Sequence, residues 1–328
     1  YDKTRTKNLC LAGGIALNSV ANKVILDRTP FERIFIQPAS GDDGCALGNA
    51  LVGWRQIMGG RSNFVMTNAY TGRTYSEREV AAALGEYSAW VQVVQQGEGV
   101  LDEICHLLTR QKIIGWFQGG SEFGPRALGH RSILCDPRQP QMKNILNKRV
   151  KHREAFRPFA PSVLAEFVDE YFDVDVPSPY MLLVAKVKRP DAVPAITHVD
   201  LTGRVQTVTR EANGVYYELI ERFYALTGVP VLLNTSYNDN EEPIVETPSD
   251  AIRCFLKTNI DYLVIGDRLL AKKWLRCKTL RIWPNDLKRW GRRRAKRLAA
   301  TSTLLAKGGR LARKILVSQD GKNIRIPG

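Results

Sequence analysis

The segment from Ser76 to Gly266 alternates helix-like and strand-like sequences, and this alternation limits the possible folds most strongly. Ser76 with Glu79 three residues later has the spacing of a capping box, which predicts the start of the first helix. Mixed order with many strands predicts an α/β or α+β domain over roughly 70–270. The predicted helices cover 76–86, 98–110, 140–149, 213–227 and 248–257, and the predicted strands are WVQVV, IIGWFQ, PSVLAE, YMLLVAKV, RVQTV, VPVLLN and YLVIG.

The first sixty residues show a second α/β pattern that is too short to form a domain. LAGGIALNSVANKVILD predicts a turn and an amphipathic helix, RIFIQP a short buried strand, and GDDGCALGNALVGWRQIM a turn and another helix. A sheet this small would expose both edges and one face. We therefore expect residues 1–60 to be one piece of a larger domain, in a chain that begins inside a longer protein. Residues 61–75 lack periodicity and are expected to form a linker.

Composition is typical of an intracellular globular protein. The 328 residues are 44% hydrophobic, which suffices for a sizeable core in about two domains. Six scattered cysteines without a CxxC pair favour reduced thiols over a disulfide framework. The sequence contains neither a signal peptide nor an apolar run of about 18 residues. We expect a cytoplasmic location.

The positive charge of the chain is concentrated in its last part. Residues 271–328 hold 18 Lys/Arg and 2 Asp/Glu, a net of +16, whereas the rest holds 30 basic and 31 acidic residues, a net of −1. Apolar residues recur at helix-like intervals between Asn285 and Val317, which predicts a basic amphipathic, largely helical tail. Binding to an anionic surface or RNA and packing of the apolar stripe on the body are equally compatible with this pattern.

A stretch rich in glycine, proline and arginine runs from Gly119 to Pro161. Its only carboxylates are Glu122, Asp136 and Glu154. Glycines and prolines shape the backbone, and guanidinium groups can bind phosphate oxygens in pairs, so the stretch predicts a phosphoryl or nucleotide site. A basic surface loop without a ligand is the simpler alternative. Its basic residues include Arg126, Arg131, Arg138, Lys148, Arg149, Lys151, Arg153 and Arg157.

Two weaker signals lie near the N-terminus. GGIALNSVAN leads from glycines into a helix, so Gly13, Gly14 and Asn18 are candidate nucleotide contacts. GDDGCALG places Asp42 between glycines, where a carboxylate suits either a metal ion or the capping of a helix.

Six motifs in order resemble the carbamoyltransferases of the NodU/CmcH type. They are GGIALNSVANKVI, PASGDDGCALGNAL, GSEFGPRALGHRSILCDPR, REAFRPFAPSVL, HVDLTGRVQTV and LLNTSYNDNEEPIVETPSDAI. The resemblance covers about Asn8 to Gly266 and is specific, because all six agree in sequence and order. It implies a carbamoyl-transfer domain of the actin-like ATPase superfamily, similar to TsaD, followed by a YrdC-like domain that makes carbamoyl-adenylate from ATP and carbamoyl phosphate. Residues 1–60 would be the last piece of the first domain and 76–270 the second.

The resemblance also implies a metal site that this sequence lacks in part. In the family an iron-type metal lies between two histidines of an HxxxH motif and an aspartate that corresponds to Asp42. None of the four histidines of this chain precedes Asp42. A fragment of a longer protein explains this departure better than a split gene, and an N-terminal half with the HxxxH histidines would be the partner.

The expected chemistry selects the residues of the YrdC-like part. Joining ATP (with Mg) to carbamoyl phosphate gathers several negative charges, which favours fixed cations. Asn234 and Ser236 follow a buried strand, a usual place for ligand contacts, although both residue types also form turns. His130 is expected to be structural rather than a proton carrier. The candidate catalytic residues are Arg126, Lys151, Arg153, Arg157 and Arg204, and the candidate nucleotide contacts here are Asn234 and Ser236.

The favoured function is transfer of a carbamoyl group to a small-molecule acceptor, of the nodulation-factor or antibiotic type. Threonylcarbamoyl-adenylate chemistry on tRNA is an alternative that the basic tail would suit. A catalytically inactive, anion-binding accessory fragment is an alternative of another class.

The charge pattern predicts that the tail is separable from the chemistry. Deleting the residues after Leu270 should leave pyrophosphate release within about twofold, because long-range attraction is screened within about 8–10 Å at physiological ionic strength. Binding to RNA or anionic vesicles, measured by co-sedimentation, should fall. Unfolding of the truncated chain would instead show that the apolar stripe packs on the body.

Overall fold

The computed structural model describes residues 1–61, 65–154, 157–240 and 242–273. The predicted basic tail therefore lies outside the described residues, apart from its first three positions. No helix in the described ranges is both long and apolar enough to cross a membrane.

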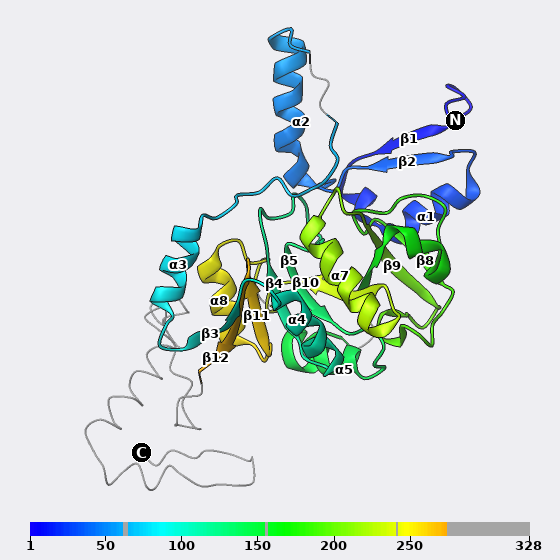
Figure 1. Ribbon diagram of the computed structural model, residues 1–328. Helices are drawn as coiled ribbons and strands as arrows, with labels where there is room; N and C mark the ends of the chain where they lie inside the picture. Colours follow the sequence, from blue (N-terminus) through cyan, green and yellow to red (C-terminus); the bar gives the residue numbers. More distant parts are fainter. Residues whose placement is uncertain (62–64, 155–156, 241, 274–328) are drawn as a thin grey trace, which may run out of the picture. The chain divides into compact units, whose positions relative to one another are not determined.

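A ten-stranded mixed sheet forms the centre of the described chain (Figure 1). Most neighbouring strands are antiparallel, and two pairs, β4 with β11 and β6 with β9, are parallel. The fold is therefore a mixed α/β fold. In spatial order the strands are β3 (Val91–Gln96), β12 (Arg268–Lys272), β11 (Tyr262–Ile265), β4 (Ile114–Phe117), β5 (Arg131–Cys135), β10 (Val231–Ser236), β6 (Ala160–Leu164), β9 (Thr202–Val208), β8 (Leu183–Val187) and β7 (Phe172–Asp173).

Helices cover both faces of this sheet, and each face has its own apolar cluster. Helices α4 (Val100–Thr109) and α7 (Gly214–Thr227) pack together on one face. Helices α3 (Glu77–Glu86), α5 (Met142–Leu146) and α8 (Pro248–Lys257) contribute to the other, and a short helix α6 (Val168–Tyr171) leads into β7. Alternate residues of a strand supply the two clusters, as Leu233 and Leu232 of β10 show.

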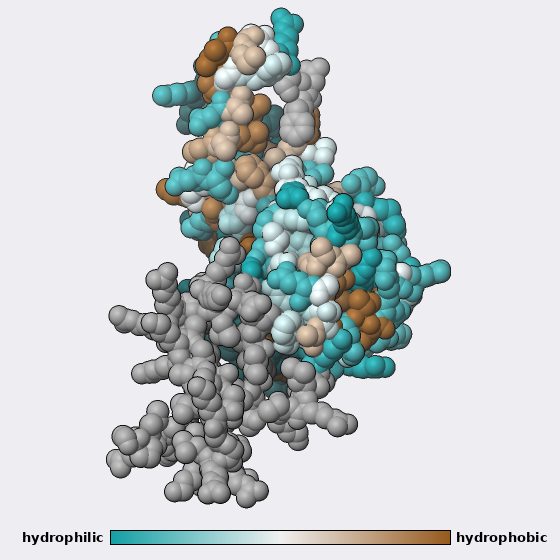
Figure 2. Space-filling view, turned by 90° about the vertical axis from the view of Figure 1, so that its left-hand side faces the viewer, coloured by the Kyte–Doolittle hydropathy of each residue, from teal (hydrophilic) through white to brown (hydrophobic). Residues whose placement is uncertain are grey.

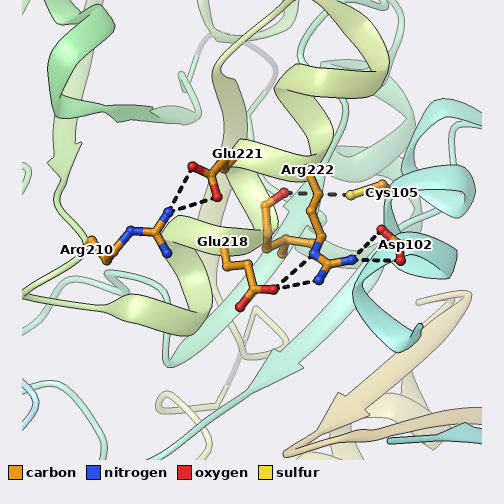
Figure 3. A network of polar contacts seen from close by, with 7 residues as sticks. Asp102, Cys105, Arg210, Glu218, Glu221 and Arg222 are labelled. Atoms are coloured by element: carbon orange, nitrogen blue, oxygen red, sulfur yellow. Dashed lines mark hydrogen bonds and ion pairs between the residues drawn. The ribbon is translucent and has the colours of Figure 1, made fainter. Parts of the chain in front are cut away.

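Charged groups join the solvent side of α4 to that of α7 (Figure 3). The guanidinium of Arg222 donates to both carboxylate oxygens of Asp102 at 2.7 Å and to Glu218 one turn away. Arg210 makes a similar two-oxygen contact with Glu221. Of these exposed pairs only Arg222 with Asp102 connects α7 to α4, and each pair contributes at most about 1 kcal/mol.

Local sequence signals account for where the helices begin. The Ser76–Glu79 capping box is present, as the spacing predicts, and Thr247 with Asp250 forms a second one at α8. Three strands of the sheet, β5, β7 and β12, were not predicted, and β7 has only two residues. Strand β5 lies inside the glycine- and arginine-rich stretch, whose composition is typical of a loop, and β12 follows the tight turn at Gly266 and Asp267.

Strand β12 extends beyond the predicted domain boundary at Leu270. It continues to Lys272, and the backbone N–H of Lys273 donates to the carbonyl of Trp90 at 2.7 Å. A deletion that tests the tail alone should therefore begin at Trp274.

The N-terminal residues form a small unit with a parallel pair of strands, β1 (Asn8–Leu11) and β2 (Arg33–Ile36). Helix α1 (Ser19–Arg28) connects them, and α2 (Cys45–Val52) follows β2 and continues into a single π-helical turn, Gly53–Ile57. Strand β1 was not predicted, because its four residues directly precede the paired glycines that marked the turn.

This N-terminal unit leaves much apolar surface uncovered, including apolar side chains of the predicted amphipathic helix α1. Val20 is 58% exposed and Val24 42%, whereas the polar Asn22 is 1% exposed. Helix α2 buries none of its residues, and Figure 2 shows brown apolar side chains gathered over this part of the molecule. An apolar helix face is buried only where another surface meets it, and no described segment covers this one.

Apolar packing and polar contacts both attach the N-terminal unit to the main sheet domain, since Ala16 and Ile36 belong to the same apolar cluster as α3, α5 and α8. Asn22 Nδ2 donates to the carbonyls of Ala16 (2.8 Å) and Leu182 (2.9 Å). Arg126 donates through Nη2 to the carbonyl of Leu17 at 3.1 Å. A methyl group at Gly124 would lie 2.5 Å from the carbonyl oxygen of Pro38, so the two backbones meet without room for a side chain.

The buried Asn22 amide should contribute to stability out of proportion to its size. Asn22→Ala leaves two carbonyls without their donor and should lower the free energy of unfolding by about 1–3 kcal/mol. Urea denaturation of this variant and of Val20→Ala, an exposed position on the same helix, provides the comparison. Equal stabilities would show that the amide does not join the two parts.

Candidate anion-binding site

Five neighbouring strands have connecting loops on the same side of the sheet, at the ends of the strands; we call this side the sheet edge. Phe117 pairs with Arg131, Ser236 with Ser132, and Asn234 with Ala160. Strands β4 and β10 therefore end where β5, β6 and the parallel β9 begin. The loops at this edge are 118–130, 152–159, 188–201 and 237–247, of which the first two carry Arg126, Arg153 and Arg157 of the predicted site.

One carboxylate oxygen shapes the loop between β4 and β5. Glu122 Oε1 accepts hydrogen bonds from the backbone N–H groups of Leu128 (2.7 Å), His130 (2.8 Å) and Arg131 (3.2 Å). These bonds fold the GPRALGH segment around the carboxylate and position Arg126. This role of Glu122 was not predicted, although a carboxylate is rare among the basic residues of this stretch and is a signal for such a role.

Several basic residues of the stretch have structural partners. Arg131 is fully buried over the ring of Phe117 and donates to backbone carbonyls, including that of Gln118 at 2.6 Å. Arg138 pairs with Asp136, and Arg149 with Asp261. These three guanidinium groups are therefore not part of the candidate site.

Lys151 lies at the end of β10 among oxygen atoms. Its ammonium group donates to Ser236 O (2.5 Å), Asn238 Oδ1 (2.7 Å), Asn238 O (3.1 Å) and Ser236 Oγ (3.2 Å). Burial, reinforced by the charge of Arg153, lowers the pKa of Lys151 to about 7. The structure thus brings together Lys151 and Ser236, which were predicted separately, and adds Asn238, which was not.

Arg204 lies beside two other arginines of the predicted set. Burial first, and then the charges of Arg126 and Arg153, lower the pKa of Arg204 to about 9. Burial also lowers the pKa of Arg126 and of Arg153. The Nε atom of each of the three is buried without a hydrogen-bond partner among the described residues.

The remaining bonds of these arginines leave donors free for a ligand. Arg126 donates to the carbonyl of Leu17, and Arg153 to that of Pro158 at 3.2 Å while lying over the ring of Phe159. In the ranges that the structure describes, neither Lys151 nor any of the three arginines forms an ion pair with a carboxylate. A partly buried cluster of cations without anions is a candidate binding site for a dense anion.

Other predicted residues lie elsewhere or have other partners. Arg157 is exposed and pairs with Glu154 at 2.8 Å. Asn234 is fully buried, where its Nδ2 donates to Ser162 Oγ (3.1 Å) and Gln206 Oε1 (3.2 Å), so its bonds are structural. Asn18 caps α1 by accepting from Val20 N and Ala21 N.

Gly13 and Gly14 are exposed, and open space surrounds the position of a side chain at each. Gly13 has a positive φ of 97°, which favours glycine whether or not a ligand approaches. Their role in nucleotide binding stays a prediction.

Asp42 begins a 3-10 turn, Asp42–Gly44, at the surface. Within the described residues, no group of three His, Cys, Asp or Glu side chains lies close enough together to hold a metal ion. The donor set around Asp42 in this chain therefore does not fit an iron site, and no chemical step is derived from one.

His130 has a structural environment, as the sequence predicts. Its ring stacks on Tyr70 with centroids 3.9 Å apart, and Nδ1 lies 2.6 Å from the carbonyl of Gly120. Burial lowers its pKa, so the ring is neutral near pH 7.

Comparison with known families agrees with the order of the six motifs. Residues 105–272 match the family described as "Carbamoyltransferase C-terminus", and residues 1–51 match "Carbamoyltransferase N-terminus". The chain belongs to the carbamoyltransferase family. The resemblance that the motifs predict is confirmed.

Individual relatives show how much of a family member this chain covers. It is 41% identical over 276 residues to nodulation protein NolO of Bradyrhizobium diazoefficiens, covering 82% of this chain and 50% of NolO. It is 32% identical over 259 residues to the 3′-hydroxymethylcephem-O-carbamoyltransferase of Amycolatopsis lactamdurans, covering 79% and 48%. The chain thus spans about half the length of the curated relatives it matches.

Among solved structures, full-length HypF in a phosphate- and nucleotide-bound form is similar at 22% identity, with a TM-score of 0.39 over 51% of this chain and 25% of HypF. A likeness this low carries no argument about the site.

The depressed pKa of Lys151 predicts how anion binding depends on pH. An anion such as ATP should bind best when the lysine is protonated, so its affinity is expected to fall up to about tenfold per pH unit above pH 7, until the pKa of the complex is reached. Titration calorimetry at pH 7 to 8.5 should show this fall in the wild type. Lys151→Met should bind more weakly at pH 7 and with a flatter dependence, and equal slopes would exclude Lys151 from the site.

Proposed function

We propose that the sheet-edge site makes carbamoyl-adenylate from ATP and carbamoyl phosphate, as the YrdC-like part of a carbamoyltransferase. The observation that carries the proposal is a cluster of four cations without a partner carboxylate in the described ranges: Lys151, which is buried, and Arg126, Arg153 and Arg204, which are partly buried with an unpaired Nε atom each. Such a cluster is costly for a folded protein unless it binds an anion. Family membership supports carbamoyl chemistry for this anion.

The proposed reaction needs fixed positive charge at two stages. Water releases phosphate from carbamoyl phosphate to leave carbamate, and a carbamate oxygen then attacks the α-phosphorus of ATP and displaces pyrophosphate. The total negative charge in the site is highest while both substrates are bound. Arginines held by desolvated surroundings stabilise this charge without reorganising, and Mg²⁺ bound to ATP would share the task.

Lys151 and Arg204 differ in their hydrogen bonds, which suggests different roles. Oxygen atoms of Ser236 and Asn238 hold the Lys151 ammonium group, so its positive charge has one fixed position. Arg204 has no hydrogen-bond partner among the described residues and can turn its planar group to a phosphate. We assign Lys151 to the leaving pyrophosphate and Arg204 to carbamoyl phosphate.

The N-terminal unit would belong to the transfer domain. Its uncovered apolar surface on α1 and α2 fits the actin-like ATPase domain that the resemblance implies, whose other part would carry the HxxxH histidines and, with Asp42, the iron-type metal. The acceptor would be a small molecule with a hydroxyl or amino group, of the type that nodulation and cephem-modifying relatives suggest. Threonylcarbamoyl transfer to tRNA stays the second candidate, favoured only by the +16 charge of residues 271–328.

Pyrophosphate release that depends on carbamoyl phosphate tests the proposal. The wild-type chain should release pyrophosphate but carbamoylate no acceptor, and Arg204→Gln should lower release at least tenfold, since a charge-assisted bond is worth about 1.5–3 kcal/mol. Arg210→Gln, which removes an exposed arginine paired with Glu221, should release it like the wild type.

Two results would contradict the proposal. Pyrophosphate release that is independent of carbamoyl phosphate would exclude this substrate. Equal loss in Arg204→Gln and Arg210→Gln would show that general charge, rather than the cluster, is responsible.

A further inference from the structure

His198 carries a buried nitrogen that no described group satisfies. The residue lies in the loop before β9, where its backbone N–H donates to Thr202 O at 2.9 Å. Its side chain is 16% exposed, and the Nε2 atom is buried without a hydrogen-bond partner. A buried polar atom without a partner is costly, and at a site edge it indicates a ligand contact.

The hydrogen bonds of Thr202 fix the tautomer of His198. The Thr202 hydroxyl donates its single proton to Asp200 Oδ1 at 2.8 Å. Towards His198 Nδ1, 3.3 Å away, the same oxygen can therefore only accept. The ring proton accordingly lies on Nδ1, which also faces Asp200 at 4.0 Å.

The imidazole of His198 is neutral near pH 7, so its Nε2 atom is a hydrogen-bond acceptor. Burial, together with the charges of Lys143 and Arg204 and against the opposing effect of Asp200, lowers the pKa of His198 to about 4. With the proton on Nδ1, Nε2 presents a bare lone pair. The unsatisfied atom is thus an acceptor that needs a donor.

The position of this acceptor narrows the choice of donor. Arg204 is close enough for its charge to act on the ring, and both residues lie where β9 begins. A ligand for this pair must combine a phosphoryl group for the guanidinium with an N–H donor near it. In carbamoyl phosphate the amino group is on the carbon that carries the ester oxygen, whereas in ATP the ribose separates the adenine amino group from the phosphates.

We propose that His198 Nε2 accepts a hydrogen bond from the carbamoyl amino group, and so selects carbamoyl phosphate over acyl phosphates that lack it. The inference rests on the proposed function, because it takes carbamoyl phosphate as the substrate. A site that offers an acceptor to a donor discriminates against a methyl group in its place, since the acceptor is then left buried and unpaired. His198 would be a specificity-determining residue rather than a base.

A pair of stable analogues tests this selection without any reaction. Phosphonoacetamide and acetonylphosphonate differ only by an amino and a methyl group next to the carbonyl. Calorimetry with the wild-type chain should show about three- to tenfold tighter binding of the amide. In His198→Phe, which keeps an aromatic ring but has no acceptor, both analogues should bind with the affinity of the ketone.

His198→Gln provides the second variant, because its amide oxygen can accept, and it should retain part of the preference. Thermal melting checks that both variants fold. If His198→Phe does not fold, the preference of the wild type for phosphonoacetamide over acetonylphosphonate still tests the proposal. Equal binding of the two phosphonates to the wild type would overturn the role of His198 and leave the proposed function intact. Binding of neither phosphonate, with ATP still bound, would overturn both. A preference for the amide that survives in His198→Phe would assign the selection to another residue.

Discussion

The ammonium group of Lys151 is held beneath the sheet edge by four oxygen atoms of Ser236 and Asn238, none of which is a carboxylate oxygen. Desolvation without a compensating negative charge explains why its pKa falls to about 7, and the same imbalance affects Arg204. A protein interior normally pairs buried charges. Here the surrounding loops keep the cations apart from carboxylates, and Glu122 binds backbone N–H groups instead. The positive potential is therefore available to a ligand.

The N-terminal unit likewise has groups without a partner among the described residues, in this case apolar side chains. Its strands and helices are correctly formed, yet Val20, Ile57 and Met58 are largely exposed. Burial of such residues contributes roughly 25 cal/mol per Å² of apolar area, so a surface left open is surface on which another segment can gain stability. The few polar contacts through Asn22 and Arg126 join the unit to the main domain and place GGIALN beside the GPRALGH loop.

The sequence predicted the elements better than the partners within the site. Helices α3 and α8 have clear capping signals, and buried strands such as β10 stand out by their apolar runs. Strand β5 was missed because arginine and glycine surround it, and the tertiary ladder with β4 and β10 overrides that composition. The site depends on side chains that the fold alone brings together. Thus Asn238 at Lys151, and the different bonds of Asn234 and Ser236, two residues apart on one strand, required the structure.

The most direct test of the central claim is a crystal structure of the chain with a non-hydrolysable ATP analogue. The account predicts that the terminal phosphates lie beside the ammonium group of Lys151 and that a phosphate oxygen bonds to the buried Nε atom of Arg126 or Arg153. Arg204, which is assigned to carbamoyl phosphate, should then still lack an anion. An analogue bound elsewhere, with the four cations still lacking an anion, would contradict it.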